Sequence, residues 1–216
     1  MNMSGPSPHH RSDSSRSVMA LIAAIHLAAD DVVLDFGVGR GERTLLIAEK
    51  LTEMNGLGVI ISCDFSRSII RDLKATAALN GLEKRIRPVC LSDIRAFTLP
   101  LAKEMTDCVL AVDSIHHLKK PLPYLKDINR ILKPTGELII ADRTQVDVHP
   151  RTQESDAIHE PQHLQTILKD AGLAIRETIH LRGYTWVLRV TKTATVKRKT
   201  PISIIPISFP KLSYSS

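Results

Sequence analysis

The hydrophobic residues of this chain fall into short runs separated by segments with a helical spacing. The runs are rich in β-branched residues and uniformly apolar, which is typical of strands buried on both faces of a sheet. They lie at Val32–Phe36, Val59–Asp64, Ile86–Leu91, Asp107–Val112 and Glu137–Asp142. This pattern predicts a largely buried sheet.

The segments between the runs carry apolar residues on one helical face. Three such sets are Ile70, Leu73 and Ala77; Leu125, Ile128 and Leu132; and Leu164, Ile167, Leu168 and Ala171. They end near Gly81, Pro134 and Gly172, which are stop signals for helices. Alternating strands and helices predict an α/β fold with a doubly wound, Rossmann-like, mostly parallel sheet.

The two ends of the pattern predict further elements. Ala174–His180 and Trp186–Thr191 flank Gly183, so they are expected to form a C-terminal antiparallel hairpin that completes a seven-stranded sheet. Val18–Ala29 is apolar and alanine-rich, and it predicts a leading helix with Ser17 among its candidate caps.

Length and composition fit one main domain. The chain has 216 residues, of which 43% are hydrophobic and 24% charged, so it can bury a sizeable core. We expect a disordered N-terminus at residues 1–12, a single α/β domain at 13–191 and a basic, proline-containing tail at 192–216.

Several classes of protein are not indicated. No apolar stretch approaches the ~18 residues of a spanning helix, and the polar start lacks the apolar block of a secretory signal. The chain has three cysteines, Cys63, Cys90 and Cys108. No two of them form a CxxC pair, and no histidine lies at the spacing of a metal ligand, so neither a disulfide framework nor a metal site is expected. A cytoplasmic location is the prediction.

The basic charge is concentrated in the tail. Five cations account for most of the formal net charge of +6: Lys192, Lys197, Arg198, Lys199 and Lys211. A basic tail can contact RNA or an anionic membrane, but solvated terminal charge is the commoner explanation. The folded part is nearly neutral, so a nucleic-acid partner is not expected.

The first strand runs into a glycine-rich stretch, VVLDFGVGRGERT, at residues 32–44. Gly37, Gly39 and Gly41 allow the backbone to turn sharply and to approach a ligand with no Cβ in the way. Ligands of open α/β sheets bind beyond the carboxyl ends of the strands. A turn that only reverses the chain is the alternative for an isolated GxGxG.

Acidic residues end the neighbouring strands. Asp64 could accept both hydroxyls of a ribose. Asp93 and Ile94 could give an adenine one acceptor and one apolar face, and Asp113 follows the fourth strand. Each aspartate taken alone is also compatible with a helix cap or a solvated loop.

A dinucleotide is a poor fit to this site. The nicotinamide fingerprint GxGxxG needs a third glycine where this chain has Glu42. An acid in the first turn of a helix would repel a pyrophosphate, and no Walker sequence occurs. The expected ligand is a nucleoside without a phosphate chain.

Five segments in series resemble the class I S-adenosylmethionine-dependent methyltransferases, in particular the small-molecule branch related to quinone-biosynthesis enzymes (methyltransferase type 11). They are VVLDFGVGRG, ISCDFS, LSDIRAFTLP, TDCVLAVDSIHHL and RILKPTGELIIAD, within residues 15–191. The last is similar to the family's R-hydrophobic-LKPGG segment, with KPTG in place of KPGG.

The resemblance implies a role for each matching residue. Asp35, Gly37, Gly39 and Gly41 would form the first motif around the methionine part of S-adenosylmethionine. Asp64 would hold the ribose, with Phe65 against the adenine, and Asp93 with Ile94 would meet the adenine edge. Asp113 and Ser114 would border the sulfonium and the acceptor.

A methyl group on a sulfonium is already activated, so in-line displacement depends mainly on alignment and exclusion of water. A base matters only for a protonated acceptor. His116 and His117 are the candidate bases because they follow the fourth strand. Four other residues are weaker candidates for the base because of their positions: Tyr184, Trp186, His149 and His159. Residues 143–160 follow the fifth strand and are a candidate lid over the site.

The acceptor is expected to be a small molecule. After the fourth strand the chain has DSIH instead of the (N/D)PP(Y/F) typical of enzymes that methylate amino groups of bases or glutamine. Two alternatives stay open: a non-catalytic cofactor-binding or partner-binding module with this fold, and an RNA or protein methyltransferase.

Overall fold

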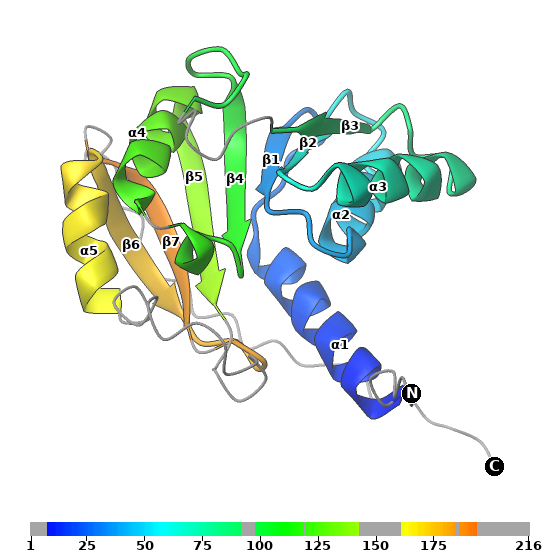
Figure 1. Ribbon diagram of the computed structural model, residues 1–216, viewed down its shortest axis with the longest axis horizontal. Coiled ribbons are helices and arrows are strands. Elements are labelled where there is room, and N and C mark those ends of the chain that lie inside the picture. The colour runs from blue at the N-terminus through cyan, green and yellow to red at the C-terminus, as the bar shows by residue number, and fades with distance from the viewer. Residues whose placement is uncertain (1–7, 92–97, 119, 143–160, 185, 194–216) are drawn as a thin grey trace.

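The computed structural model describes residues 8–91, 98–118, 120–142, 161–184 and 186–193 (Figure 1). Asp93, Ile94, the candidate lid at 143–160 and the tail from residue 194 lie outside these ranges. None of the helices within them is long and apolar enough to cross a membrane.

One seven-stranded sheet forms the centre of the molecule, in the order β3-β2-β1-β4-β5-β7-β6. The strands are β1 Val32–Phe36, β2 Val59–Asp64, β3 Ile86–Cys90, β4 Thr106–Val112, β5 Leu132–Asp142, β6 Leu173–Ile179 and β7 Trp186–Lys192. β7 pairs antiparallel with both β5 and β6, and the other pairs are parallel. The predicted doubly wound sheet with its C-terminal hairpin is therefore confirmed.

Helices cover both faces of this sheet. They are α1 Pro8–Ala24, α2 Glu42–Glu53, α3 Arg67–Leu79, α4 Pro121–Ile131 and α5 Pro161–Asp170, with the short 3-10 helix η1 Ile115–His117 after β4. Because side chains alternate along a strand, neighbours such as Val33 and Leu34 enter different cores. Leu34 joins the core under α4 and α5, and Val33 joins the core under α1, α2 and α3.

Two predicted helices have wrong bounds. The leading helix was expected at Val18–Ala29 after a disordered start, but α1 spans Pro8–Ala24, so residues 8–12 are helical. The helical set ending at Leu132 stops at Ile131, because Leu132 pairs with Thr106 and begins β5. Apolar spacing shows which side chains are buried, but here tertiary contacts decide where each element ends.

One arginine joins α1 to the sheet. Arg189 of β7 donates to the carbonyl oxygen of Ala24 at 2.9 Å, and its Nη1 lies 2.7 Å from His26 Nδ1. Glu137 and Glu177 pair with the same guanidinium, each at 3.2 Å. Arg189 thus holds the last turn of α1 against strands from the C-terminal part of the domain.

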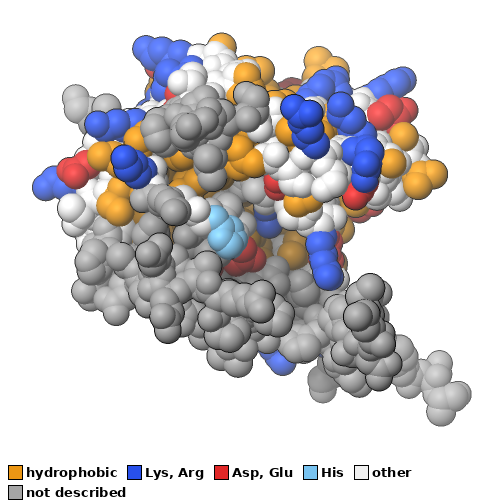
Figure 2. Space-filling model, viewed as in Figure 1, with side chains coloured by type: hydrophobic (Ala, Val, Ile, Leu, Met, Phe, Trp, Pro, Cys, Tyr) orange, Lys and Arg blue, Asp and Glu red, His pale blue; other side chains and the backbone are white. Residues whose placement is uncertain are grey.

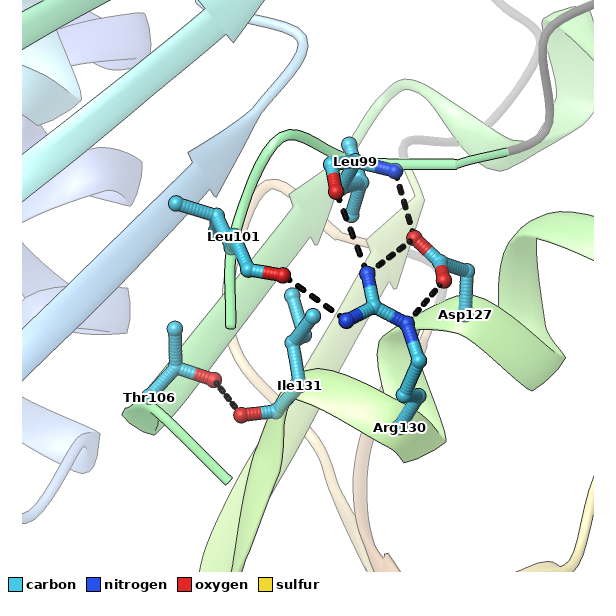
Figure 3. Close-up of polar contacts among 6 residues, drawn as sticks. All are labelled: Leu99, Leu101, Thr106, Asp127, Arg130 and Ile131. Atoms are coloured by element: carbon cyan, nitrogen blue, oxygen red, sulfur yellow. Dashed lines mark hydrogen bonds and ion pairs between the residues drawn. The ribbon is translucent and has the colours of Figure 1, made fainter. Parts of the chain in front are cut away.

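A second arginine joins α4 to the segment that enters β4 (Figure 3). Arg130 donates to the carbonyl oxygens of Leu101 at 2.7 Å and Leu99 at 3.1 Å, and it forms an ion pair with Asp127. Asp127 in turn accepts from the backbone N–H of Leu99. In this chain the arginine of the RILKPTG segment therefore positions the start of a central strand.

Candidate cofactor-binding site

A pocket of about 260 Å³ lies where the carboxyl ends of β1, β2 and β4 meet. Its lining residues are Phe36, Gly37, Gly39, Cys63, Asp64, Phe65, Asp113, Ser114, His117 and Leu118. In Figure 2, apolar, acidic and histidine surface meet in the hollow near the middle of this face. This volume lies just below the range of about 300–1,000 Å³ that is common for ligand pockets.

The glycine-rich stretch forms one wall of this pocket. Gly37, Gly39 and Gly41 all have positive φ angles, of 83°, 57° and 78°, so each adopts a conformation that other residues rarely take. At Gly37 a side chain would also collide with Ser114, because a Cβ there would lie 2.8 Å from Ser114 Cβ. Gly37 and Gly39 line the pocket, whereas Gly41 lines a neighbouring hollow with Arg40.

Asp35 lies behind the glycine-rich stretch and is absent from the pocket lining. Its side chain is fully buried, and Oδ1 accepts from Arg43 Nη2 at 2.7 Å and from Arg43 Nε at 3.0 Å. Its Oδ2 accepts from the Thr44 hydroxyl at 2.6 Å. Both carboxylate oxygens are therefore engaged within the protein, which differs from the contact with the methionine part that the resemblance implied.

Arg43 extends this network to the loop itself. Its Nη2 also donates to the carbonyl oxygen of Gly37 at 2.8 Å, and its side chain is only 8% exposed. Thr44 lies 3.3 Å, Oγ1 to Oγ, from Ser62 of β2. The first turn of α2, the end of β1, the loop and β2 are thereby tied together.

Arg43 and Thr44 are absent from the site residues predicted from the sequence. A positive charge in the first turn of a helix is unfavourable, since the macrodipole is positive there. Arg43 occupies that turn in α2, and its countercharge is the buried Asp35. An arginine at the start of a helix that follows a buried aspartate is the signal that could have revealed the pair.

The two carboxylate oxygens of Asp64 differ in their hydrogen bonds. Oδ1 accepts from the backbone N–H of Ser66 at 2.8 Å, next to the start of α3, where Ser66 is the N-cap. No residue in the described ranges donates to Oδ2. The next residue, Phe65, packs edge-on against Phe36 and Tyr124 with ring centroids 6.4 Å from each.

The residues after β4 form the opposite wall. Asp113 has a φ of 49°, a left-handed conformation that is uncommon outside glycine, and its N–H donates to Ala141 O at 2.9 Å. Such backbone strain is typical of functional sites. Asp113 and Ser114 both line the pocket.

Of the two candidate bases, His117 lines the pocket and its side chain is exposed. The side chain of His116, like His149 and His159, lies outside the described residues. Tyr184 and Trp186 are buried and belong to the hydrophobic cores rather than to the pocket lining.

Cys63 is a core residue, as predicted, and it also lines the pocket. Burial, with smaller effects of the Asp35 and Asp64 charges, raises the pKa of its thiol to about 12. Since only the thiolate is nucleophilic, Cys63 stays neutral and inert at physiological pH.

The family comparisons agree with this geometry. A methyltransferase domain family matches residues 27–173. The O-methyltransferase resE of Aspergillus sclerotiorum is 28% identical over 74% of this chain and 61% of its own length. The demethylmenaquinone methyltransferase of Lactiplantibacillus plantarum is 29% identical over 58% of this chain and 51% of its own length.

The fold has solved counterparts as well. A SAM-dependent methyltransferase from Aquifex aeolicus superposes with a TM-score of 0.69 at 19% identity, covering 85% of this chain and 93% of the other. The chain belongs to the methyltransferase domain family, and the class I resemblance is confirmed. It spans about half to three fifths of the length of the two curated relatives.

Replacement of Arg43 should lower the free energy of unfolding, because it breaks the buried ion pair with Asp35. In Arg43→Met, Asp35 keeps a buried charge without a cation, which costs about 3–5 kcal/mol. The free energy of unfolding in urea measures this loss. The matched control is Lys133→Met, which breaks the half-exposed pair with Asp107 at the start of β4 and should cost about 1 kcal/mol or less. Equal losses in both variants would contradict the buried-pair interpretation.

Alkylation should distinguish the cysteines. Cys90 is exposed, while Cys63 and Cys108 are buried, and the pKa of Cys63 is raised to about 12. Below that pH the Cys63 thiol is neutral, so iodoacetamide at neutral pH should label Cys90 first and Cys63 only after unfolding. Peptide mass spectrometry reports the order. Labelling of native Cys63 as fast as Cys90 would show that its thiol is accessible and ionised.

Proposed function

We propose that this chain transfers a methyl group from S-adenosylmethionine to a small-molecule acceptor. The observation that carries the proposal is the composition of the pocket lining. Its ten described residues include two aspartates, two glycines and no lysine or arginine. Such a lining suits an uncharged nucleoside with a cationic substituent and offers no countercharge to a phosphate chain.

The residues present fit this cofactor. Asp64 Oδ2 is available to accept from ribose hydroxyls, and the aromatic group around Phe65 provides an apolar neighbour for a base. Gly37 and Gly39 have no Cβ to obstruct a ligand that crosses the loop. When bound, the cofactor supplies an activated methyl group, so the protein has to align the acceptor and exclude water.

His117 is the proposed base for acceptors that must lose a proton. Its side chain lines the pocket beside Ser114, whose carbonyl oxygen accepts from the His117 N–H at 3.2 Å. Small-molecule chemistry is consistent with the names of the relatives, an O-methyltransferase and a demethylmenaquinone methyltransferase. A phenol or another weakly acidic group is therefore the class of acceptor to test first.

Calorimetry with S-adenosylhomocysteine tests cofactor binding. Wild-type protein should bind, and Asp64→Ala should bind about ten-fold to one hundred-fold more weakly because it loses charge-assisted hydrogen bonds. Asp170→Ala, an exposed aspartate at the end of α5, is the control and should bind like wild type. No heat with the wild-type chain would refute the proposal.

Turnover of a phenolic acceptor, followed by release of S-adenosylhomocysteine, tests the base. His117→Gln should lower kcat by about one hundred-fold or more and should leave the affinity for S-adenosylhomocysteine unchanged. Unchanged kcat would remove His117 from the mechanism while leaving methyl transfer intact.

A further inference from the structure

One buried hydroxyl in the pocket has no hydrogen-bond partner among the described residues. Ser114 is 8% exposed, and its Oγ neither donates to nor accepts from any group that the structure describes. An unsatisfied buried hydroxyl reduces the stability of the folded state, so a native protein rarely keeps one without a purpose. Ser114 also lines the pocket.

The Ser114 side chain is held in place by its surroundings. Its Cβ would lie only 2.8 Å from a Cβ at Gly37, so the glycine backbone packs directly against it. Its own carbonyl oxygen already accepts from His117 N. The Ser114 carbonyl oxygen is therefore engaged, and the buried hydroxyl remains for a ligand.

The strand order shows which part of a ligand reaches this hydroxyl. At this edge of the sheet, Asp64 ends β2, Gly37 follows β1 and Ser114 comes shortly after β4, and these strands are neighbours in that order. The 5′ substituent of a nucleoside held by its ribose at Asp64 would have Gly37 and then Ser114 as its neighbours along this edge. In S-adenosylmethionine the hydrogen-bonding groups of that substituent are the ammonium and carboxylate of the amino acid.

We propose that the Ser114 hydroxyl binds the amino-acid end of the cofactor and so makes the site selective for ligands that carry it. This inference rests on the proposed function. The hydroxyl can donate to the carboxylate or accept from the ammonium, and both are charge-assisted hydrogen bonds. Ser114 is thus a binding residue whose free hydroxyl lowers the stability of the unliganded protein.

Ser114→Ala should separate stability from binding. Without ligand, the variant should melt about 2–4 °C higher than wild type, because it no longer buries an unsatisfied hydroxyl. Its affinity for S-adenosylhomocysteine should fall about ten-fold or more. Its affinity for 5′-methylthioadenosine, which has the same nucleoside but no amino acid, should match that of wild type.

Thr106→Val is the matched control at the other end of β4. The Thr106 hydroxyl is buried but donates to Ile131 O at 3.1 Å, so its loss should lower the melting temperature and leave both affinities unchanged. A lower melting temperature in Ser114→Ala would show that the hydroxyl has a partner in the protein, and it would overturn the inference.

The binding measurements distinguish failure of this inference from failure of the proposed function. Equal loss of both ligands in Ser114→Ala, or no loss of either, would also overturn the inference while cofactor binding by the wild type stands. If the wild-type chain binds neither ligand, the proposed function itself fails.

Discussion

The ion pair between Asp35 and Arg43 is the constraint on which the site depends. It fills the space behind the glycine-rich stretch with two opposite charges, and Arg43 reaches from there to the Gly37 carbonyl oxygen. A loop of residues with positive φ angles has many alternative conformations when free. Because the network joins β1 and the first turn of α2, these alternatives are restricted and one face of the loop is turned to the pocket.

The residues after β4 carry features that favour a binding site at the expense of stability. Asp113 has a left-handed backbone and Ser114 a buried hydroxyl without a described partner, and both features destabilise the folded state. They follow β4, a central strand with β1 and β5 on its two sides. Local strain is tolerated at this position because the surrounding sheet fixes the backbone on both sides.

Much of the fold could be predicted because burial imposes a pattern on the sequence. β1 and β2 have their predicted bounds, and the apolar runs and glycines gave the sheet, its hairpin and the pocket walls. The pairing of Arg43 with Asp35 could not be predicted in the same way, because a contact between charged side chains leaves no periodic signal. The early start of α1 was missed for a related reason, since polar residues at the beginning of a helix do not show apolar spacing.

The attachment of α1 through Arg189 has a consequence for biosynthesis. The helix is synthesised before β7, and the guanidinium that binds the Ala24 carbonyl oxygen lies 165 positions after Ala24. Domains acquire such long-range contacts only after the intervening chain is available. The contact of Arg189 with the end of α1 is therefore a late event of folding, whereas Val18, Leu21 and Ile22 share a core with residues of α2, which follow them closely in the chain.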